Sequence, residues 1–488
     1  MRLLPANRGT FPDTFSKSLI METSKKHARK VVRLSREMQD NYAHSRKVRI
    51  YHGTSNSTRV LSFKKNGVVD ISDLDQVIKV NKNGRYAIVE PNVPMDKLVN
   101  ETLKHGLIPP VVMEFPGITV GGGIQGGAGE SSSFKWGLFD NCCLEYEVIL
   151  GNGKVVKASP KVKADLFYGL ASSYGSVGII SAAKLKLIPA KKYVRLKYIK
   201  VNSFEEVVEV IKKETKRGSD FVDGILFSKN LGVVMEGTLT DYVDLPITTF
   251  SKTTDEWFYL HAKKNAEKKS GWEEIIPIRD YFFRYDQGTF WVSRYAFLRL
   301  KFPFNRFTRM LFNVAFKTRA MFRFLQALKT SQQTITQDIS LSADKIFTFL
   351  DYLDKNINIY PLWFCPLRPI KDAFLSPIFM STDLIINVGV WGKLIKDFKK
   401  ILNLNRKIEK KTLELGGRKI LYAQCYYPES EFWSIYDRQK YDKLREKYDS
   451  TKTFPDIYDK VIVKEKYKVS YLGGLVSFIK SPTKYPIS

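Results

Sequence analysis

The chain has 488 residues, of which 44% are hydrophobic and 13% aromatic, and its 79 basic and 50 acidic residues give a formal net charge of +29. This length and composition exclude an intrinsically disordered chain and allow two or three domains with sizeable cores. The charge predicts attraction to a polyanion, which is either nucleic acid, an acidic substrate or cofactor, or an anionic membrane surface.

The four cysteines have no metal-ligand spacing, and the adjacent pair Cys142 and Cys143 cannot form a bridge without strain. We therefore expect no metal site, and a reducing compartment. No apolar run reaches the roughly 18–20 residues that a membrane-spanning helix needs. The first residues, MRLLPANRGTFPDTF, lack the apolar core of a signal peptide. The sequence predicts neither a transmembrane helix nor a signal peptide.

Basic and apolar residues are mixed over residues 16–47, which predicts an exposed N-terminal helical segment that we assign to residues 1–44. A first unit of strands and helices follows at residues 45–192. We predict strand, polar loop and strand for KVRIYHGTSNSTRVLSF, and strand, turn and a helix closed by Gly106 for GRYAIVEPNVPMDKLVNETLKHG. A hairpin is predicted for YEVILGNGKVVKAS, and helix, glycine turn and strand for ADLFYGLASSYGSVGIISAAKLKLIPA.

A second unit is predicted at residues 193–430, with a strand at YVRLKYIKV, a helix over 204–217 and strands around 224–237. Residues 431–488 are assigned to a C-terminal helical segment and tail. Because each unit combines strands with separate helices, we predict an α+β fold.

The first unit contains PGITVGGGIQGGAGESSSFKWG, residues 116–137, in which seven of the first fourteen residues are glycine. Glycine at this density is typical of backbone that must approach a phosphate closely. Gly121, Gly123 and Gly126 match the dinucleotide pattern G-x-G-x-x-G, but prolines interrupt the approach to it, which argues against a Rossmann site. The apolar runs on either side argue against a mobile linker.

Two further segments have the composition of a phosphate-binding turn. Residues 52–58, HGTSNST, offer backbone donors and several hydroxyl groups in close succession, although an ordinary turn has the same composition. A second glycine turn contains Gly175 and Gly178. Together with the glycine-rich segment, these turns predict a site with three binding segments.

In this order, the three segments resemble the FAD-binding domain of the vanillyl-alcohol oxidase and p-cresol methylhydroxylase (PCMH) superfamily. Within it the sequence is most similar to the delta-24 sterol reductases, the diminuto-like proteins, over roughly residues 45–462. The similar segments include TVGGGIQGGAGESSSFKWGLF, DLFYGLASSYGSVGIISAAKLKLIPAKKYV, IPIRDYFFRYDQGTFW, YPLWFCP and EFWSIYDRQKYDKLREKY. The resemblance implies a PCMH-type FAD-binding domain of two subdomains, followed by an α+β substrate (cap) domain.

The resemblance also implies which residues contact FAD. In many members of the superfamily a histidine of the first segment attaches the flavin covalently, but Asn56 stands at that place and His52 at the place of an arginine. We therefore expect noncovalent FAD. The implied contacts are His52, Gly53, Thr54, Ser55, Asn56, Ser57 and Thr58, then Thr119, Val120, Gly121, Gly122, Gly123, Ile124, Gln125, Gly126, Gly127, Ala128, Gly129, Glu130, Ser131, Ser132 and Gly137, then Gly175, Gly178 and Ile179.

The reaction implied by the resemblance is saturation of a side-chain alkene of a sterol or related isoprenoid lipid. FAD reduced by NADPH would supply a hydride, and a protein acid would supply the proton. Histidines that the family carries are replaced here by Asp280, Phe283 and Tyr285, so the acid and the exact substrate stay open. The alternatives are a PCMH-type flavin oxidase or dehydrogenase of another substrate, and a noncatalytic lipid-binding scaffold. The catalytic candidates are Tyr281, Arg284, Glu130, Tyr422 and Tyr426.

Residues 287–337 contain no acidic residue but nine basic ones, with phenylalanines between them. This pattern indicates an anionic membrane surface as partner, a buried helix pair with snorkelling cations, or nucleic-acid binding, which we expect least. The C-terminal run VSYLGGLVSFIK is too short to span a membrane but suits the same surface. We expect a cytoplasmic protein or one peripheral on an intracellular membrane, on the cytosolic face of the endoplasmic reticulum in a eukaryote.

Overall fold

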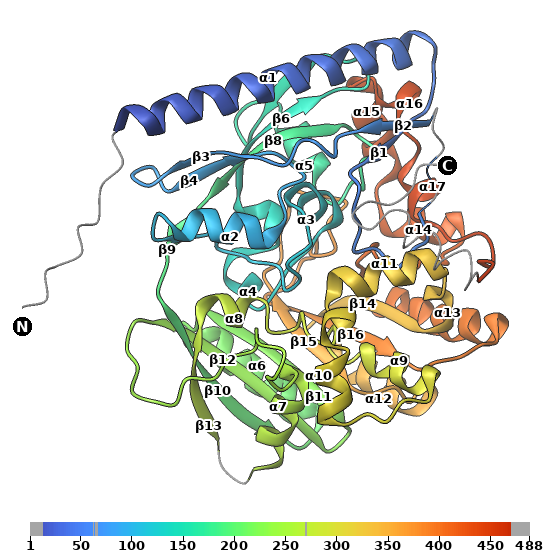
Figure 1. Cartoon of the computed structure of the whole chain (residues 1–488). Coiled ribbons are helices and arrows are strands. Elements are labelled where there is room, and N and C mark those ends of the chain that lie inside the picture. The colour runs from blue at the N-terminus through green and yellow to red at the C-terminus, as the bar shows by residue number, and fades with distance from the viewer. Residues whose placement is uncertain (1–12, 62, 64–66, 269–270, 470–488) are drawn as a thin grey trace, which may run out of the picture.

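The computed structural model describes residues 13–61, 63, 67–268 and 271–469, without the side chains of residues 13–20. The predicted contributions of residues 1–12 and of VSYLGGLVSFIK after its first residue therefore lie outside the described residues. The described chain forms two units, each built around an antiparallel sheet (Figure 1). The predicted α+β fold class is confirmed.

The sheet of the first unit has five strands in the order β3-β4-β8-β6-β7. Hairpin β6–β7 is confirmed, and Gly153, at a φ of 82°, allows its turn. The predicted second strand near residues 59–63 is wrong, because β1 pairs instead with a strand at Val68–Asp70. The strands and main helices are β1 (Arg49–Tyr51), β2 (Val68–Asp70), β3 (Val77–Asn81), β4 (Tyr86–Val89), α2 (Met95–Leu103), β5 (Leu107–Ile108), α3 (Val120–Gly126), α4 (Ser133–Trp136), β6 (Cys143–Ile149), β7 (Val155–Ala158), α5 (Ala164–Leu170), β8 (Ile179–Lys186) and β9 (Ile188–Pro189).

The N-terminal helix α1 (Asp13–Ala43) crosses the first unit (Figure 1). The prediction that it is exposed is wrong for one face, because Leu34 and Met38 are fully buried in a small core with β2. His27 lies 2.9 Å from Glu90 and 3.0 Å from Glu147. Burial lowers the pKa of His27, but its hydrogen bonds to Glu147 and Glu90 raise it to about 9. A charged histidine thus bridges two carboxylates and holds α1 on the sheet.

The second unit contains an eight-stranded sheet in the order β13-β10-β12-β11-β15-β16-β14-β17. Its helix α6 and strands β11 and β12 confirm the elements predicted over 204–217 and around 224–237. The elements are β10 (Tyr193–Val201), α6 (Phe204–Lys216), β11 (Phe221–Ser228), β12 (Leu231–Thr240), α7 (Phe258–Glu267), β13 (Trp272–Pro277), α8 (Ile278–Phe282), β14 (Ile335–Ser342), α12 (Ile346–Asn356), β15 (Leu362–Leu367), β16 (Ile385–Gly392), α13 (Phe398–Glu414) and β17 (Arg418–Lys419).

The two faces of this sheet belong to different cores because side chains alternate along each strand. On β12, Val234 packs with helices α6, α12 and α13 on one face. Its neighbours Val233 and Met235 belong to the large core that continues into the first unit. The second face of the sheet therefore forms the boundary with the first unit.

Between α8 and β14 the chain inserts helices α9 (Ser293–Leu300), α10 (Arg306–Leu311) and α11 (Thr318–Leu328). After β17, helices α14 (Glu429–Ile435), α15 (Arg438–Lys447), α16 (Ser450–Thr453) and α17 (Ile457–Val461) return to the first unit, where α15 contacts α5 and α16 contacts α1 (Figure 1). Within the described ranges, no helix has both the length and the apolar character needed to cross a membrane.

Candidate functional site

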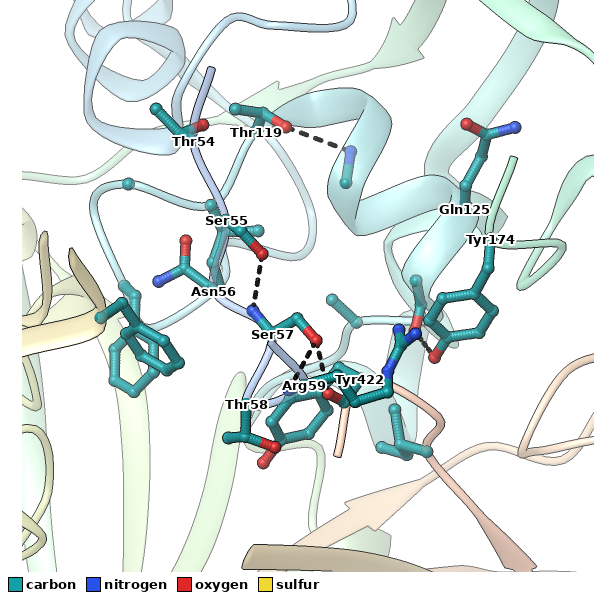
Figure 2. Close-up of a pocket in the computed structure, with 18 of the residues that line it drawn as sticks. Thr54, Ser55, Asn56, Ser57, Thr58, Arg59, Thr119, Gln125, Tyr174 and Tyr422 are labelled. Atoms are coloured by element: carbon teal, nitrogen blue, oxygen red, sulfur yellow. Dashed lines mark hydrogen bonds between the residues drawn. The ribbon is translucent and has the colours of Figure 1, made fainter. Parts of the chain in front are cut away.

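A cavity lies between the two units, and all three predicted binding segments contribute to its wall. The second unit adds residues of β14, β15 and β16, and the insertion adds residues of α11. Figure 2 shows side chains of the first segment and α3 together in this wall. The predicted site residues that line it are His52, Thr54, Ser55, Asn56, Ser57, Thr58, Thr119, Gly121, Gly122, Gln125, Gly126, Ala128, Gly129, Gly175, Ile179 and Tyr422.

The glycine-rich segment contains the short helix α3. Thr119 caps this helix, since its hydroxyl oxygen accepts a hydrogen bond from the backbone N–H of Gly122 at 3.2 Å (Figure 2). A Cβ on Gly123 would lie 2.6 Å from Met113, so this glycine permits close packing against the core. A Cβ on Gly126, in contrast, would meet no described atom within 4 Å, although Gly126 lines the cavity. The missing side chain of Gly126 therefore leaves room for a ligand.

Hydrogen bonds join the glycine-rich segment to the second glycine turn, and the first segment to the second unit. The Tyr174 hydroxyl donates to the carbonyl oxygen of Gly126 at 2.8 Å, and the Gln125 amide donates to that of Gly178 at 3.1 Å. The Ser57 hydroxyl donates to the carbonyl oxygen of Tyr422 at 2.9 Å (Figure 2). The wall of the cavity is thus held in place before any ligand contributes.

Positive charge gathers where β1 and α17 reach the cavity. Arg49, Arg59 and Lys460 all line it. Arg59 is only 8% exposed, and its Nε has no hydrogen-bond partner among the described residues. Burial and the nearby charges of Arg49 and Arg59 lower the pKa of Lys460 to about 7. The repulsion among these three cations and the Nε–H donor of Arg59, which is unpaired within the described chain, indicate an anion-binding site. The diphosphate of FAD fits such a site.

Another part of the wall is aromatic and carries two carboxyl groups. The rings of Trp363 and Trp391 stack with centroids 5.6 Å apart, and the ring centroid of Phe290 lies 4.6 Å from that of Trp391. Asp338 accepts hydrogen bonds from Asn387 at 2.9 Å, from Trp391 Nε1 at 3.1 Å and from the Tyr422 hydroxyl. Glu114 is the second carboxyl group.

Of the five predicted catalytic candidates, all within the described chain, only Tyr422 lines the cavity. Arg284, Glu130 and Tyr281 meet in a buried cluster behind it, and Tyr426 donates to Gln424 at 2.6 Å. Their catalytic roles stay predictions. The predicted cofactor contacts outside the lining are Gly53, Val120, Gly123, Ile124, Gly127, Glu130, Ser131, Ser132, Gly137 and Gly178.

Five charged residues of the wall were not among the residues predicted from the sequence. Two had a visible signal: Glu114 is the single acid in the apolar run VVMEFPG, and Asp338 continues a row of polar residues at alternate positions of a strand. Arg49, Arg59 and Lys460 had no such signal, because basic residues are frequent throughout this chain.

Comparison with known proteins bears on this site. A family model described as an FAD binding domain matches residues 26–159. The Delta(24)-sterol reductase of Macaca fascicularis is 31% identical over 414 residues, which cover 83% of this chain and 80% of that protein. A Delta(24)-sterol reductase homolog of Caenorhabditis elegans is 29% identical over 463 residues, covering 89% and 87%. The Delta(24)-sterol reductase of Pisum sativum is 27% identical over 446 residues, covering 80% and 76%.

The matched domain includes the first two binding segments, so fold and site define a flavin-dependent oxidoreductase with a PCMH-type FAD-binding domain. The similarity to sterol reductases extends over both units. The chain belongs to the delta(24)-sterol reductase family. The family resemblance seen in the sequence is thereby confirmed.

We expect Gly126→Val to lose FAD while the protein stays folded, because the added Cβ meets no atom of the described chain within 4 Å but the side chain competes with a ligand for the cavity. Overpacking of this kind costs about 1–3 kcal/mol, which is roughly a 5- to 150-fold weaker affinity. Flavin absorbance measures the FAD content, and circular dichroism shows whether the protein is folded. Gly122 is a less direct choice, since its Cβ would lie 2.9 Å from the capping oxygen of Thr119.

Gly271→Val is the matched control, because a Cβ there would make only an ordinary contact, 3.4 Å from the carbonyl oxygen of Tyr198, and Gly271 is outside the cavity lining. It should keep FAD. Full flavin occupancy in folded Gly126→Val protein would contradict the placement of FAD along α3.

Proposed function

We propose that the protein saturates a side-chain carbon–carbon double bond of a sterol or related isoprenoid lipid, with NADPH as the reductant of FAD. The observation that carries the proposal is the cavity, in which FAD-binding segments face an aromatic wall formed by Phe290, Trp363 and Trp391. Such a wall suits an apolar chain better than a sugar or another polar substrate. Family membership supports the same substrate class.

FAD supplies the hydride chemistry, and the residues of this chain orient the reactants. The cations Arg49, Arg59 and Lys460 would hold the diphosphate, and the glycines of α3 would let the cofactor approach the backbone. The aromatic wall would position the alkene and keep water away from it.

The test is anaerobic reduction of the purified protein by NADPH, followed by addition of sterols with and without a side-chain alkene. We expect the flavin to bleach with NADPH and to recover its colour only with the alkenes, whose products gain the mass of two hydrogen atoms. Oxidised products would instead indicate a flavin oxidase or dehydrogenase of another substrate. A chain without flavin would indicate a lipid-binding scaffold.

We further propose that the FAD is held without a covalent bond, because Asn56 stands where related proteins carry the linking histidine, and an amide cannot form that bond. Acid precipitation should release the flavin into the supernatant and leave a colourless pellet. A yellow pellet that keeps its colour after washing would show that another residue is linked to the flavin.

For the partner of the insertion, we propose an anionic intracellular membrane to which the protein binds peripherally. We define the α9–α10 surface by the large apolar residues and the two cations that are exposed between residues 298 and 314. Its members are Leu298, Leu300, Lys301, Phe302, Arg306, Phe307, Met310, Leu311 and Val314.

Other residues of the same stretch have partners inside the protein. Arg319 forms an ion pair with Asp96 at 2.7 Å, and the guanidinium of Arg309 lies 5.1 Å from the ring centre of Phe304. Phe297 and Phe316 are buried in the core. The stretch is therefore part core and part surface, and a membrane test should change only the α9–α10 surface.

We expect Lys301→Gln together with Arg306→Gln to weaken binding to anionic liposomes, because each cation near such a surface contributes on the order of 1 kcal/mol, or about fivefold. The apolar residues should leave a salt-resistant remainder. The control pair is Lys82→Gln with Lys161→Gln, two exposed lysines of the first unit. Liposome sedimentation measures both. Equal binding by the two double variants would contradict the proposed surface.

A further inference from the structure

Glu114 occupies the connection between β5 and α3, where the two units meet. Its neighbour Phe115 has ring-centre distances of 5.8 Å to Phe290 and 5.9 Å to Phe322, both of the insertion region. Glu114 itself lines the cavity and is half-buried. Its carboxyl group is therefore placed where the FAD-binding segments and the aromatic wall face the same space.

The surroundings of Glu114 favour the protonated acid. No cation of the described chain lies within 4.0 Å of its carboxyl group, and the charged groups that act on it are Glu130, Asp338 and Arg284. Arg284 is already paired with Glu130 and Asp223. Burial, and then the charge of Glu130, raise the pKa of Glu114 to about 8. At neutral pH, Glu114 thus offers an O–H donor to the cavity.

Three other acidic groups that line the cavity are less suited to give a proton to a substrate. Burial raises the pKa of Asp338 to about 6, although three donors stabilise its charged form, so Asp338 is mostly a carboxylate at neutral pH. The Tyr422 hydroxyl directs its proton to Asp338, and burial raises its pKa well above the ordinary value. The thiol of Cys365 also lines the cavity, and burial raises its pKa well above the ordinary value. Two carboxyl groups with unlike surroundings commonly divide acid and anion roles between them.

We propose that Glu114 is the catalytic acid that gives a proton to the substrate alkene, an inference that rests on the proposed function. The π bond of the alkene breaks and two C–H bonds form. One hydrogen arrives as a hydride, with the electron pair that the reduced cofactor supplies. The other arrives as the proton of the Glu114 O–H bond, whose electron pair stays on the carboxylate. Solvent returns the proton to Glu114 after product leaves.

Other residues of the cavity wall support this step. Proton transfer to an isolated alkene places positive charge on the second carbon, and the faces of Trp363, Trp391 and Phe290 stabilise a cation. The carboxylate of Asp338, which accepts a hydrogen bond from Trp391 at 3.1 Å, adds a negative charge next to this aromatic ring. The acid and the groups that stabilise charge therefore belong to different units and meet only in the cavity.

The test measures the two steps of the reaction separately in the variants Glu114→Gln and Glu114→Asp. The control is Glu205→Gln, because Glu205 is exposed on α6 and outside the cavity lining. Reduction of the flavin by NADPH and its reoxidation by the alkene are followed separately by stopped-flow absorbance. In Glu114→Gln we expect the second step to slow by about 10²- to 10⁴-fold, the usual contribution of a general acid. Glu114→Asp should recover part of this rate.

In the wild type, the rate of the second step should be constant at low pH and fall above about pH 8, where Glu114 loses its proton, and this break should vanish in Glu114→Gln.

Infrared difference spectra recorded between acidic and alkaline pH, without substrate, should show a carboxyl group that titrates near pH 8 and is missing from Glu114→Gln. This second readout is independent of turnover and separates the acid from the carboxyl groups of Asp338 and Glu130.

The outcomes are distinct. If wild-type protein reduces no alkene of the panel, the proposed function fails, and the role of Glu114 with it. If the wild type does so and Glu114→Gln keeps the rate and the pH break of its second step, the proposed function stands and Glu114 is not the acid. A slowed first step in Glu114→Gln, with an unchanged second step, would also overturn the inference and give Glu114 a role in cofactor binding.

Discussion

The buried guanidinium of Arg284 is the contact on which the relation of the two units depends. It is fully buried and lies 2.9 Å from Glu130 of the glycine-rich segment and 3.0 Å from Asp223 on β11. Removing one partner of a buried ion pair typically costs about 3–5 kcal/mol, because the remaining charge is left uncompensated. The cluster therefore fixes the glycine-rich segment against the sheet of the second unit.

Further hydrogen bonds extend this contact to the cavity wall. Asp223 also accepts from the Tyr285 hydroxyl at 2.6 Å and from Trp363 Nε1 at 3.2 Å. The backbone N–H of Val222 donates to the carbonyl oxygen of Ser131 at 2.8 Å. Because Trp363 lines the cavity, the cluster that joins the units also orients one side of the aromatic wall. This position gives Glu130 and Arg284 a structural function beside the catalytic one that we predicted.

Elements and site residues with a local signal could be predicted from the sequence. The β6–β7 hairpin follows from its glycine turn, and the glycine-rich segment does line the cavity. The roles of single glycines could not be predicted in this way. Gly123 packs against Met113, a residue outside the glycine-rich segment, whereas a Cβ at Gly126 would meet no other described atom within 4 Å. Lys460 reaches the cavity only because α17 returns to the first unit, which no local pattern predicts.

The same limit explains why three interpretations of the basic stretch stayed open. Its phenylalanines look alike in the sequence, yet Phe322 of α11 lines the cavity, Phe316 is buried and Phe307 is 65% exposed. Tertiary packing, and not helical periodicity, decides which apolar face is covered. One insertion thus carries apolar residues both at the α9–α10 surface and in the cavity wall. If an apolar substrate arrives from a membrane at that surface, as proposed, it would meet the same insertion that contributes Phe290 and Phe322 to the cavity wall, and membrane binding and catalysis would share one structural element.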